Sequence, residues 1–84
     1  MEEITLSCTG IETKPQLHAA LAEALHFPDW YGHNLDALYD CLTELRNVHL
    51  ILTQWQTLPD WKAAFEAVLQ DAENDTHGFT VTFA

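Results

Sequence analysis

Basic residues are scarce in this sequence of 84 residues. It contains three Lys and Arg against thirteen Asp and Glu, and its formal net charge is −10. Binding to nucleic acid or to an anionic membrane depends on Lys and Arg that neutralise phosphates, so we expect neither activity. The same charge would attract a basic protein and speed its diffusional encounter with the chain, although acidity can also serve solubility alone.

Cysteine is also rare. Cys8 and Cys41 lie far apart, form no CxxC pair and fall among apolar residues, which predicts two buried thiols. A secreted domain of this length more often carries several disulfides. The first ten residues have neither the basic nor the apolar region of a signal peptide, and no apolar run is long enough to span a bilayer. We therefore expect a reduced, cytoplasmic protein.

Glycine and proline occur only three times each, and 48% of the residues are hydrophobic, which favours a folded globule over disorder. The length suits one domain over residues 1–84. Apolar patterning predicts strands at residues 4–8, 48–52 and 79–83. Capping signals predict helices at 13–26, 34–45 and from 57–60 to 77. This order favours an α/β fold with a small, parallel three-stranded sheet.

The helix predicted at 34–45 has two unlike faces. At about 100° per residue its leucines share one face and its acidic residues the other. Asp36 and Asp40 are four residues apart, where like charges destabilise a helix by roughly 0.2–0.5 kcal/mol. Glu44 extends this row, and no Lys or Arg offsets it before Arg46. Taken alone, a row of this kind is most often a solvated helix face.

Aromatic residues gather beside the acidic row. Trp30 and Tyr31 lie in a loop marked by Pro28 and Gly32, directly before the helix, and Tyr39 borders the row within it. Tryptophan, tyrosine and charged groups on one exposed patch resemble the anchors that dominate protein interfaces. The combination favours a protein-binding surface formed by this loop and helix.

Catalytic and metal-binding interpretations of these residues have weaker support. Asp36 and Asp40 could act as general acid and base, as in glycosidases, but neighbours on one exposed helix lack the facing walls of a cleft. His33 with these two aspartates could ligate a metal, but the spacing matches no strong metal site. Ser7 has no motif around it, and Cys41 has the apolar setting of an inert thiol. We expect no enzyme activity, metal or cofactor, and keep a small hydrolytic or metal-dependent enzyme as an alternative.

Between residues 17 and 43 the sequence closely resembles the barstar family, the intracellular inhibitors of barnase-type ribonucleases. The most specific part of the match, at positions 28–43, is the run PDWYGHNLDALYDCLT. The order of strands and helices agrees over nearly the whole chain, but beyond Arg46 the match is architectural more than literal. The resemblance implies a barstar-like α/β fold, with a small three-stranded parallel sheet packed with about three to four helices.

The resemblance also implies a mechanism. In this family the loop and helix enter the nuclease active site, where acidic side chains take the place of RNA phosphates. Asp40 matches the central aspartate, which is expected to meet the catalytic arginines and histidine of the enzyme, and Asp36 matches its acidic neighbour. The residues predicted to bind the partner are Trp30, Gly32, Asn34, Leu35, Asp36, Tyr39, Asp40, Thr43, Glu44 and Asp71.

Several positions depart from the family pattern. Glu44 stands where the family has glycine, and Leu45 replaces an aromatic residue. The segment after Trp55 is shorter, so the small helix found there in the family is expected to be reduced or lost. The acidic contact on the last helix falls at Asp71 or Glu73, with Asp71 preferred. These departures point to a cognate nuclease other than barnase.

We therefore predict a 1:1 complex with a basic ribonuclease. The enzyme would be a barnase-like ribonuclease secreted by the producing cell or a ribonuclease toxin domain. A module of the same fold that binds a different basic protein is the alternative.

Overall fold

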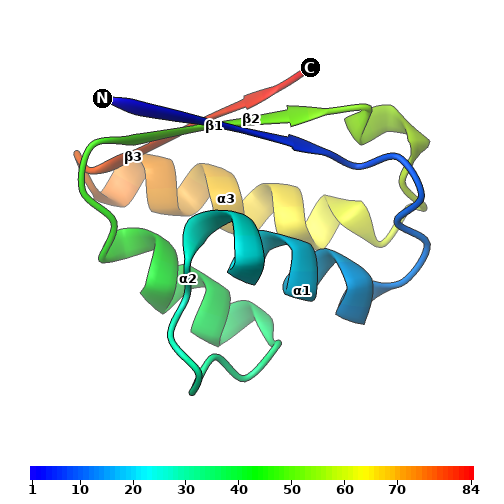
Figure 1. Cartoon of the computed structure of the whole chain (residues 1–84), viewed down its shortest axis with the longest axis horizontal. Coiled ribbons are helices and arrows are strands. Elements are labelled where there is room, and N and C mark those ends of the chain that lie inside the picture. Colours follow the sequence, from blue (N-terminus) through cyan, green and yellow to red (C-terminus); the bar gives the residue numbers. More distant parts are fainter.

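The computed structural model describes residues 1–84 and contains one sheet of three parallel strands in the order β1-β2-β3. The strands are β1 (Glu2–Ser7), β2 (Val48–Thr53) and β3 (Phe79–Phe83). The helices are α1 (Lys14–Leu25), α2 (Leu35–Thr43), α3 (Lys62–Asp75) and a short 3-10 helix, η1 (Trp55–Thr57). The three α-helices lie together on one face of the sheet (Figure 1). The predicted α/β fold with a parallel sheet is confirmed.

The core fills the space between this face of the sheet and the helices. Along the central strand β2, the inward residues Val48, Leu50 and Leu52 are buried, whereas the residues between them are half-buried. No residue of this central strand is fully exposed, and it has the most apolar sequence of the three strands. Cys8 and Cys41 are free, buried thiols, as their apolar neighbours predict.

The start of α1 follows its sequence signal. The Thr13 hydroxyl accepts a hydrogen bond from the Gln16 N–H, and the Gln16 side chain accepts one from the Thr13 N–H, so the predicted capping box forms. The helix ends at His26, which adopts a left-handed backbone with φ 56°. The loop of residues 26–34 then runs along the side of the molecule away from the sheet (Figure 1).

The start of α3 corrects the sequence prediction, because the capping box expected at residues 57–60 does not form. The Thr57 hydroxyl instead donates to the Gln54 carbonyl within η1. The buried Trp55 side chain ties η1 to α3, since its indole N–H donates to Glu66 of α3 at 2.8 Å. The helix therefore begins only at Lys62, without a side-chain cap. The intervening helix is reduced to the three residues of η1, as the short segment predicts.

The ends of α2 and α3 are also shorter than predicted. Helix α2 ends at Thr43 rather than residue 45, and α3 at Asp75 rather than residue 77. Thr76 has an extended backbone with φ −139°, which stops α3, and its hydroxyl accepts from the Gly78 N–H. These early ends leave two short connections that run side by side into β2 and β3.

Gly78 allows these two connections to approach each other closely. A Cβ atom at this position would lie 2.0 Å from the backbone oxygen of Leu45. The Gly78 carbonyl also accepts from the Val48 N–H at 2.9 Å. Together the contacts tie the segment that follows α2 to the first residues of β3, and thereby fix where α2 ends relative to the sheet.

Candidate protein-binding site

Helix α2 separates its acidic and apolar faces as predicted. Leu38 and Leu42 are fully buried, whereas Asp36, Asp40 and Glu44 are exposed. The helix packs mainly against α3, so its acidic residues remain on the surface. Asp36 lies in the first turn, where the helix dipole favours a negative charge. Glu44 lies just past the last turn, as the C-cap residue.

The loop before α2 is joined to the helix through Asn34. Its side-chain oxygen accepts from the Ala37 N–H at 2.8 Å, which caps the helix, and its amide nitrogen donates to the Gly32 carbonyl at 3.3 Å. A Cβ atom on Gly32 would lie 2.9 Å from that amide nitrogen, so glycine suits this turn. The Trp30 side chain is 63% exposed at the surface of the loop.

Tyr31 corrects the sequence interpretation, which placed it among the exposed aromatic residues. The side chain is 6% exposed and packs against Phe27, with ring centres 5.0 Å apart. Its hydroxyl shares a hydrogen bond of 2.5 Å with Nδ1 of His18 on α1. Burial raises the pKa of Tyr31, with a smaller contribution from Cys41. Tyr31 therefore anchors the loop to the core, and of these two neighbouring aromatic residues only Trp30 is exposed.

His18 is a buried, structural histidine; from the sequence it is expected to be structural or solvated. It is 5% exposed and is the only buried polar side chain. Its ring lies 4.7 Å from Phe65 of α3 and 5.8 Å from His33 of the loop, measured between ring centres. The available signal was its spacing, because His18 precedes Leu21 by three residues and Leu25 by seven, which places it on the buried face of α1.

The stability of the fold should fall in mild acid because of His18. Burial, with a smaller effect of His33, lowers the pKa of His18 below its usual 6.5. Between the two pKa values the unfolded chain binds more protons than the folded one, so stability is lost as the pH falls below about 6.5. We expect a lower Tm at pH 5.5 than at pH 7.5, measured by circular dichroism. His18→Gln should reduce this difference; an unchanged difference would rule out His18 as its source.

Tyr39 connects the acidic residues of α2 with those of α3. Its hydroxyl donates to the Asp75 carboxylate at 2.5 Å. This hydrogen bond raises the pKa of Tyr39, and the charges of Asp75, Asp71 and Asp40 raise it further. Carboxylates of both helices, Asp40 on α2 and Asp71 and Asp75 on α3, thus act on one phenol. We use the term acidic surface for Asp36, Asp40 and Glu44 of α2 together with Asp71 and Asp75 of α3.

Asp75 is a member of the acidic surface that the sequence interpretation missed, although it lies one helical turn after Asp71. Glu73, the alternative to Asp71, points elsewhere. It is half-buried, and its carboxylate accepts from the Val81 N–H of β3 at 2.9 Å. Of the two candidates on α3, only Asp71 contributes to the raised pKa of Tyr39.

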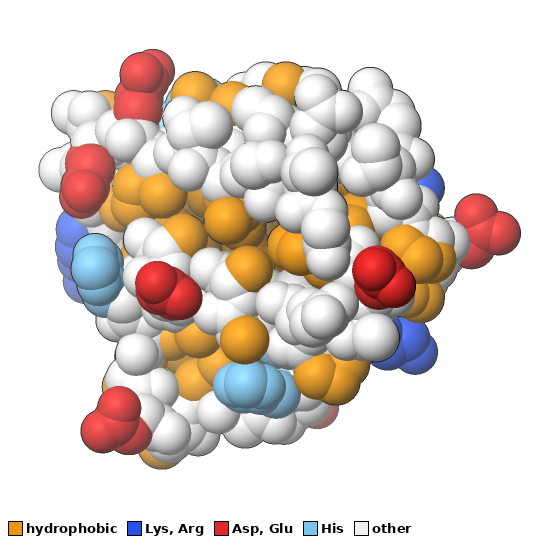
Figure 2. All heavy atoms as spheres, turned by 45° about the vertical axis from the view of Figure 1, so that its right-hand side comes forward, with side chains coloured by type: hydrophobic (Ala, Val, Ile, Leu, Met, Phe, Trp, Pro, Cys, Tyr) orange, Lys and Arg blue, Asp and Glu red, His pale blue; other side chains and the backbone are white.

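The remaining predicted residues lie at the border of the acidic surface. Leu35 and Thr43 are half-buried on α2, and the Thr43 hydroxyl donates to the Asp40 carbonyl at 3.1 Å. The structure thus brings the ten predicted residues onto one loop and two adjoining helices. Figure 2 shows acidic side chains scattered over the face in view, with Lys and Arg only at its margins.

No group of three or more His, Cys, Asp and Glu side chains is placed to hold a metal ion. The one pocket lies at the amino ends of β2 and β3, and neither Asp36 nor Asp40 lines it. No helix has the length and apolar character needed to cross a membrane.

These features define a small parallel α/β protein with an exposed acidic surface beside an exposed aromatic side chain. The chain belongs to the Barstar family: it matches the family described as Barstar (barnase inhibitor) over residues 1–84. It is also 49% identical, over 43 residues, to a protein of Bacillus subtilis (strain 168) described as "Putative ribonuclease inhibitor YrdF". That match covers 51% of this chain and 47% of the relative, so it spans about half the length of each. The family resemblance of the sequence is confirmed.

Proposed function

We propose that this protein inhibits a basic ribonuclease by placing α2 and the loop before it in the active site of the enzyme. The observation that carries the proposal is the acidic surface, in which exposed carboxylates of α2 and α3 meet around Tyr39 in a chain of the Barstar family. Active sites that cleave RNA present cationic groups to its phosphates, and carboxylates on a rigid helix can take the place of those phosphates.

Asp40 is the central group in this proposal. It is exposed on α2 in the free protein, and its charge acts on Tyr39 together with those of Asp71 and Asp75 of α3. Docking would remove its hydration and replace it with charge-assisted hydrogen bonds from arginine and histidine side chains of the enzyme. Asp36, one turn earlier, would contact the same cationic region nearer to its edge.

The aromatic side chains would supply apolar contact beside these charges. Trp30 is 63% exposed in the free protein, and its burial against the enzyme would add a favourable hydrophobic contribution of about 1.5–3 kcal/mol. The buried Tyr31 holds the loop in place before binding, so little ordering is required when Trp30 docks. The net charge of −10 would speed the encounter with a basic enzyme.

The proposed target is a ribonuclease other than barnase, because Glu44 and Leu45 depart from the family pattern at the end of α2. In the cell the protein would protect its producer either from its own secreted ribonuclease or from a delivered ribonuclease toxin. A basic protein of another kind is the alternative partner.

Titration of ribonuclease activity tests this proposal. Increasing amounts of the protein are added to a barnase-type ribonuclease encoded beside it, and cleavage of a fluorescent RNA is followed. We expect activity to fall linearly and to vanish near one equivalent. The matched control is the Asp36→Asn, Asp40→Asn double variant, which should inhibit only at large excess. Cleavage that continues unchanged at several equivalents of the unmodified protein would refute the proposal.

A further inference from the structure

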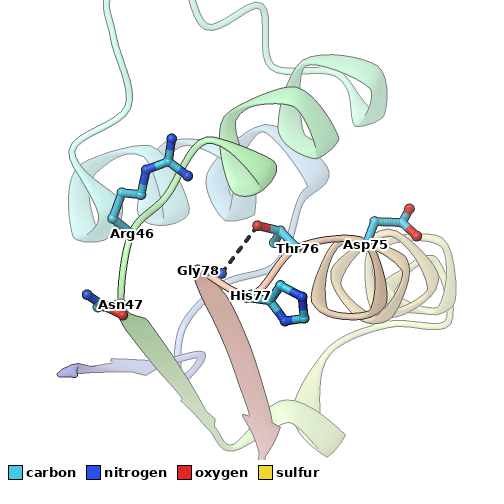
Figure 3. Close-up of a pocket in the computed structure, with 6 residues that line it drawn as sticks. All are labelled: Arg46, Asn47, Asp75, Thr76, His77 and Gly78. Carbon is cyan, nitrogen blue, oxygen red and sulfur yellow. Dashed lines mark hydrogen bonds between the residues drawn. The ribbon is translucent and has the colours of Figure 1, made fainter.

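A basic group lies at the edge of the acidic surface. Arg46 follows α2, and its side chain lines a pocket of about 370 Å³ that has no hydrophobic side chain in its wall. Figure 3 shows the lining residues, which are Arg46, Asn47, Asp75, Thr76, His77 and Gly78. Asp75 also accepts the hydrogen bond from Tyr39, so the pocket directly adjoins the acidic surface.

The guanidinium of Arg46 has no partner among the residues of the pocket. The one hydrogen bond between them joins the Gly78 N–H to the Thr76 hydroxyl, at 3.2 Å. In Figure 3, Arg46 and Asp75 lie on opposite sides of the pocket and do not point toward each other. Arg46 is exposed, and its planar fork of N–H donors is therefore free for a group outside the chain.

The backbone on both sides of Arg46 is held by contacts, so the point from which its side chain extends is defined before binding. The preceding Leu45 packs its carbonyl against Gly78. The following Asn47 adopts a left-handed backbone with φ 57°, and its carbonyl accepts from the Glu2 N–H at 2.7 Å. A fixed backbone lowers the entropic cost of ordering the side chain against a partner.

We propose that Arg46 binds a carboxylate of the ribonuclease at the rim of the interface. This inference rests on the proposed function. A basic enzyme facing the acidic surface would repel an unpaired arginine beside it, unless the enzyme places an acidic group opposite. Arginine pairs with a carboxylate through two parallel hydrogen bonds, which fixes orientation as well as proximity.

The role of this contact would be specificity. A row of carboxylates alone is attracted to many basic surfaces, in many orientations. One cation at the end of the row would distinguish the cognate enzyme from other basic proteins. A basic surface without an acidic group opposite Arg46 would be repelled by its like charge. Arg46 would thus select the cognate ribonuclease and align α2 within its active site.

Charge reversal tests the inference through the sign of its effect. Arg46→Glu makes the chain more acidic. If Arg46 met no acidic group of the basic enzyme, this change would therefore strengthen binding. We instead expect the Kd for the ribonuclease, measured by fluorescence titration at physiological salt, to rise at least tenfold. Arg46→Lys should give an intermediate Kd, because lysine keeps the charge but cannot make the two parallel hydrogen bonds. An Arg46→Glu variant that binds as well as, or more tightly than, the unmodified chain would overturn the inference.

The matched control is Lys14→Glu, which changes the net charge equally. Lys14 is exposed at the start of α1, at the opposite side of the molecule from the start of β2 (Figure 1). This variant should change the Kd less than threefold. Circular dichroism of each variant verifies folding. The unmodified chain tests the proposed function separately. If it does not bind the ribonuclease, both the proposed function and the inference are refuted. If it binds tightly and Arg46→Glu binds equally well, only the inference is refuted.

Discussion

Replacement of Asp40 by alanine is expected to weaken the complex with the ribonuclease by about 3–5 kcal/mol, a rise in Kd of roughly a hundredfold to several thousandfold. Removal of the carboxylate would leave the cationic groups of the enzyme buried without a partner, and this desolvation penalty is larger than the net value of the contact. Asp40 is exposed on α2, so the fold should remain intact. Isothermal titration calorimetry measures the Kd and unfolding in urea verifies the stability.

Glu44→Ala is the matched control for Asp40→Ala, since it removes an exposed carboxylate just past the end of the same helix. A group at the border of the interface stays solvated, and its loss should change the binding free energy by about 1 kcal/mol or less. Equal losses for the two variants would show that binding depends on total charge and that Asp40 has no central role.

Gly78→Ala is expected to have the largest effect on stability, with a loss of about 3 kcal/mol or more. The added Cβ would lie 2.0 Å from the Leu45 oxygen, 3.0 Å from the Leu45 carbonyl carbon and 3.2 Å from the Arg46 Cα. All three are backbone atoms, so no change of side-chain rotamer relieves the contact. A chain of this length has a total stability of about 4–13 kcal/mol, of which this loss is a large part. Urea unfolding monitored by circular dichroism measures it.

Gly10→Ala provides the comparison for Gly78→Ala. Gly10 has φ +85°, and a Cβ atom there would meet no atom within 4 Å. The substitution therefore imposes only the strain of a left-handed backbone, about 1–2 kcal/mol. If Gly78→Ala destabilised the fold no more than Gly10→Ala, the close approach of the two connections would not constrain the structure.

The elements that the sequence predicts well depend on local chemistry. The capping box of Thr13 and Gln16 and the Asn34 cap each involve residues three apart, and both form as predicted. The division of α2 into acidic and apolar faces follows from helical periodicity, and the exposure of Asp36 and Asp40 follows from it in turn. Helical connections between the strands were sufficient to predict the parallel sheet.

The elements that the sequence predicts poorly depend on contacts between distant residues. In place of the expected cap at Thr57, η1 forms, and its Trp55 reaches Glu66 on α3. Tyr31 has the composition of an interface residue, but it is buried because His18, thirteen residues earlier, offers a hydrogen-bond partner in the core.

Asp75 is connected to α2 by its hydrogen bond with Tyr39, which lies 36 residues away in the sequence. Helical spacing can place His18 on a buried face and Asp75 beside Asp71, but which distant residue each one meets depends on how α1, α2 and α3 pack.

Competition with RNA for the active site tests the central claim most directly. The Kd of the protein for its ribonuclease is measured at increasing concentrations of an oligonucleotide that the enzyme binds but cannot cleave. If the acidic surface takes the place of RNA phosphates, the apparent Kd rises in proportion to the oligonucleotide concentration, and no ternary complex forms. An unchanged Kd, with the oligonucleotide and the protein bound to the enzyme together, would contradict the account.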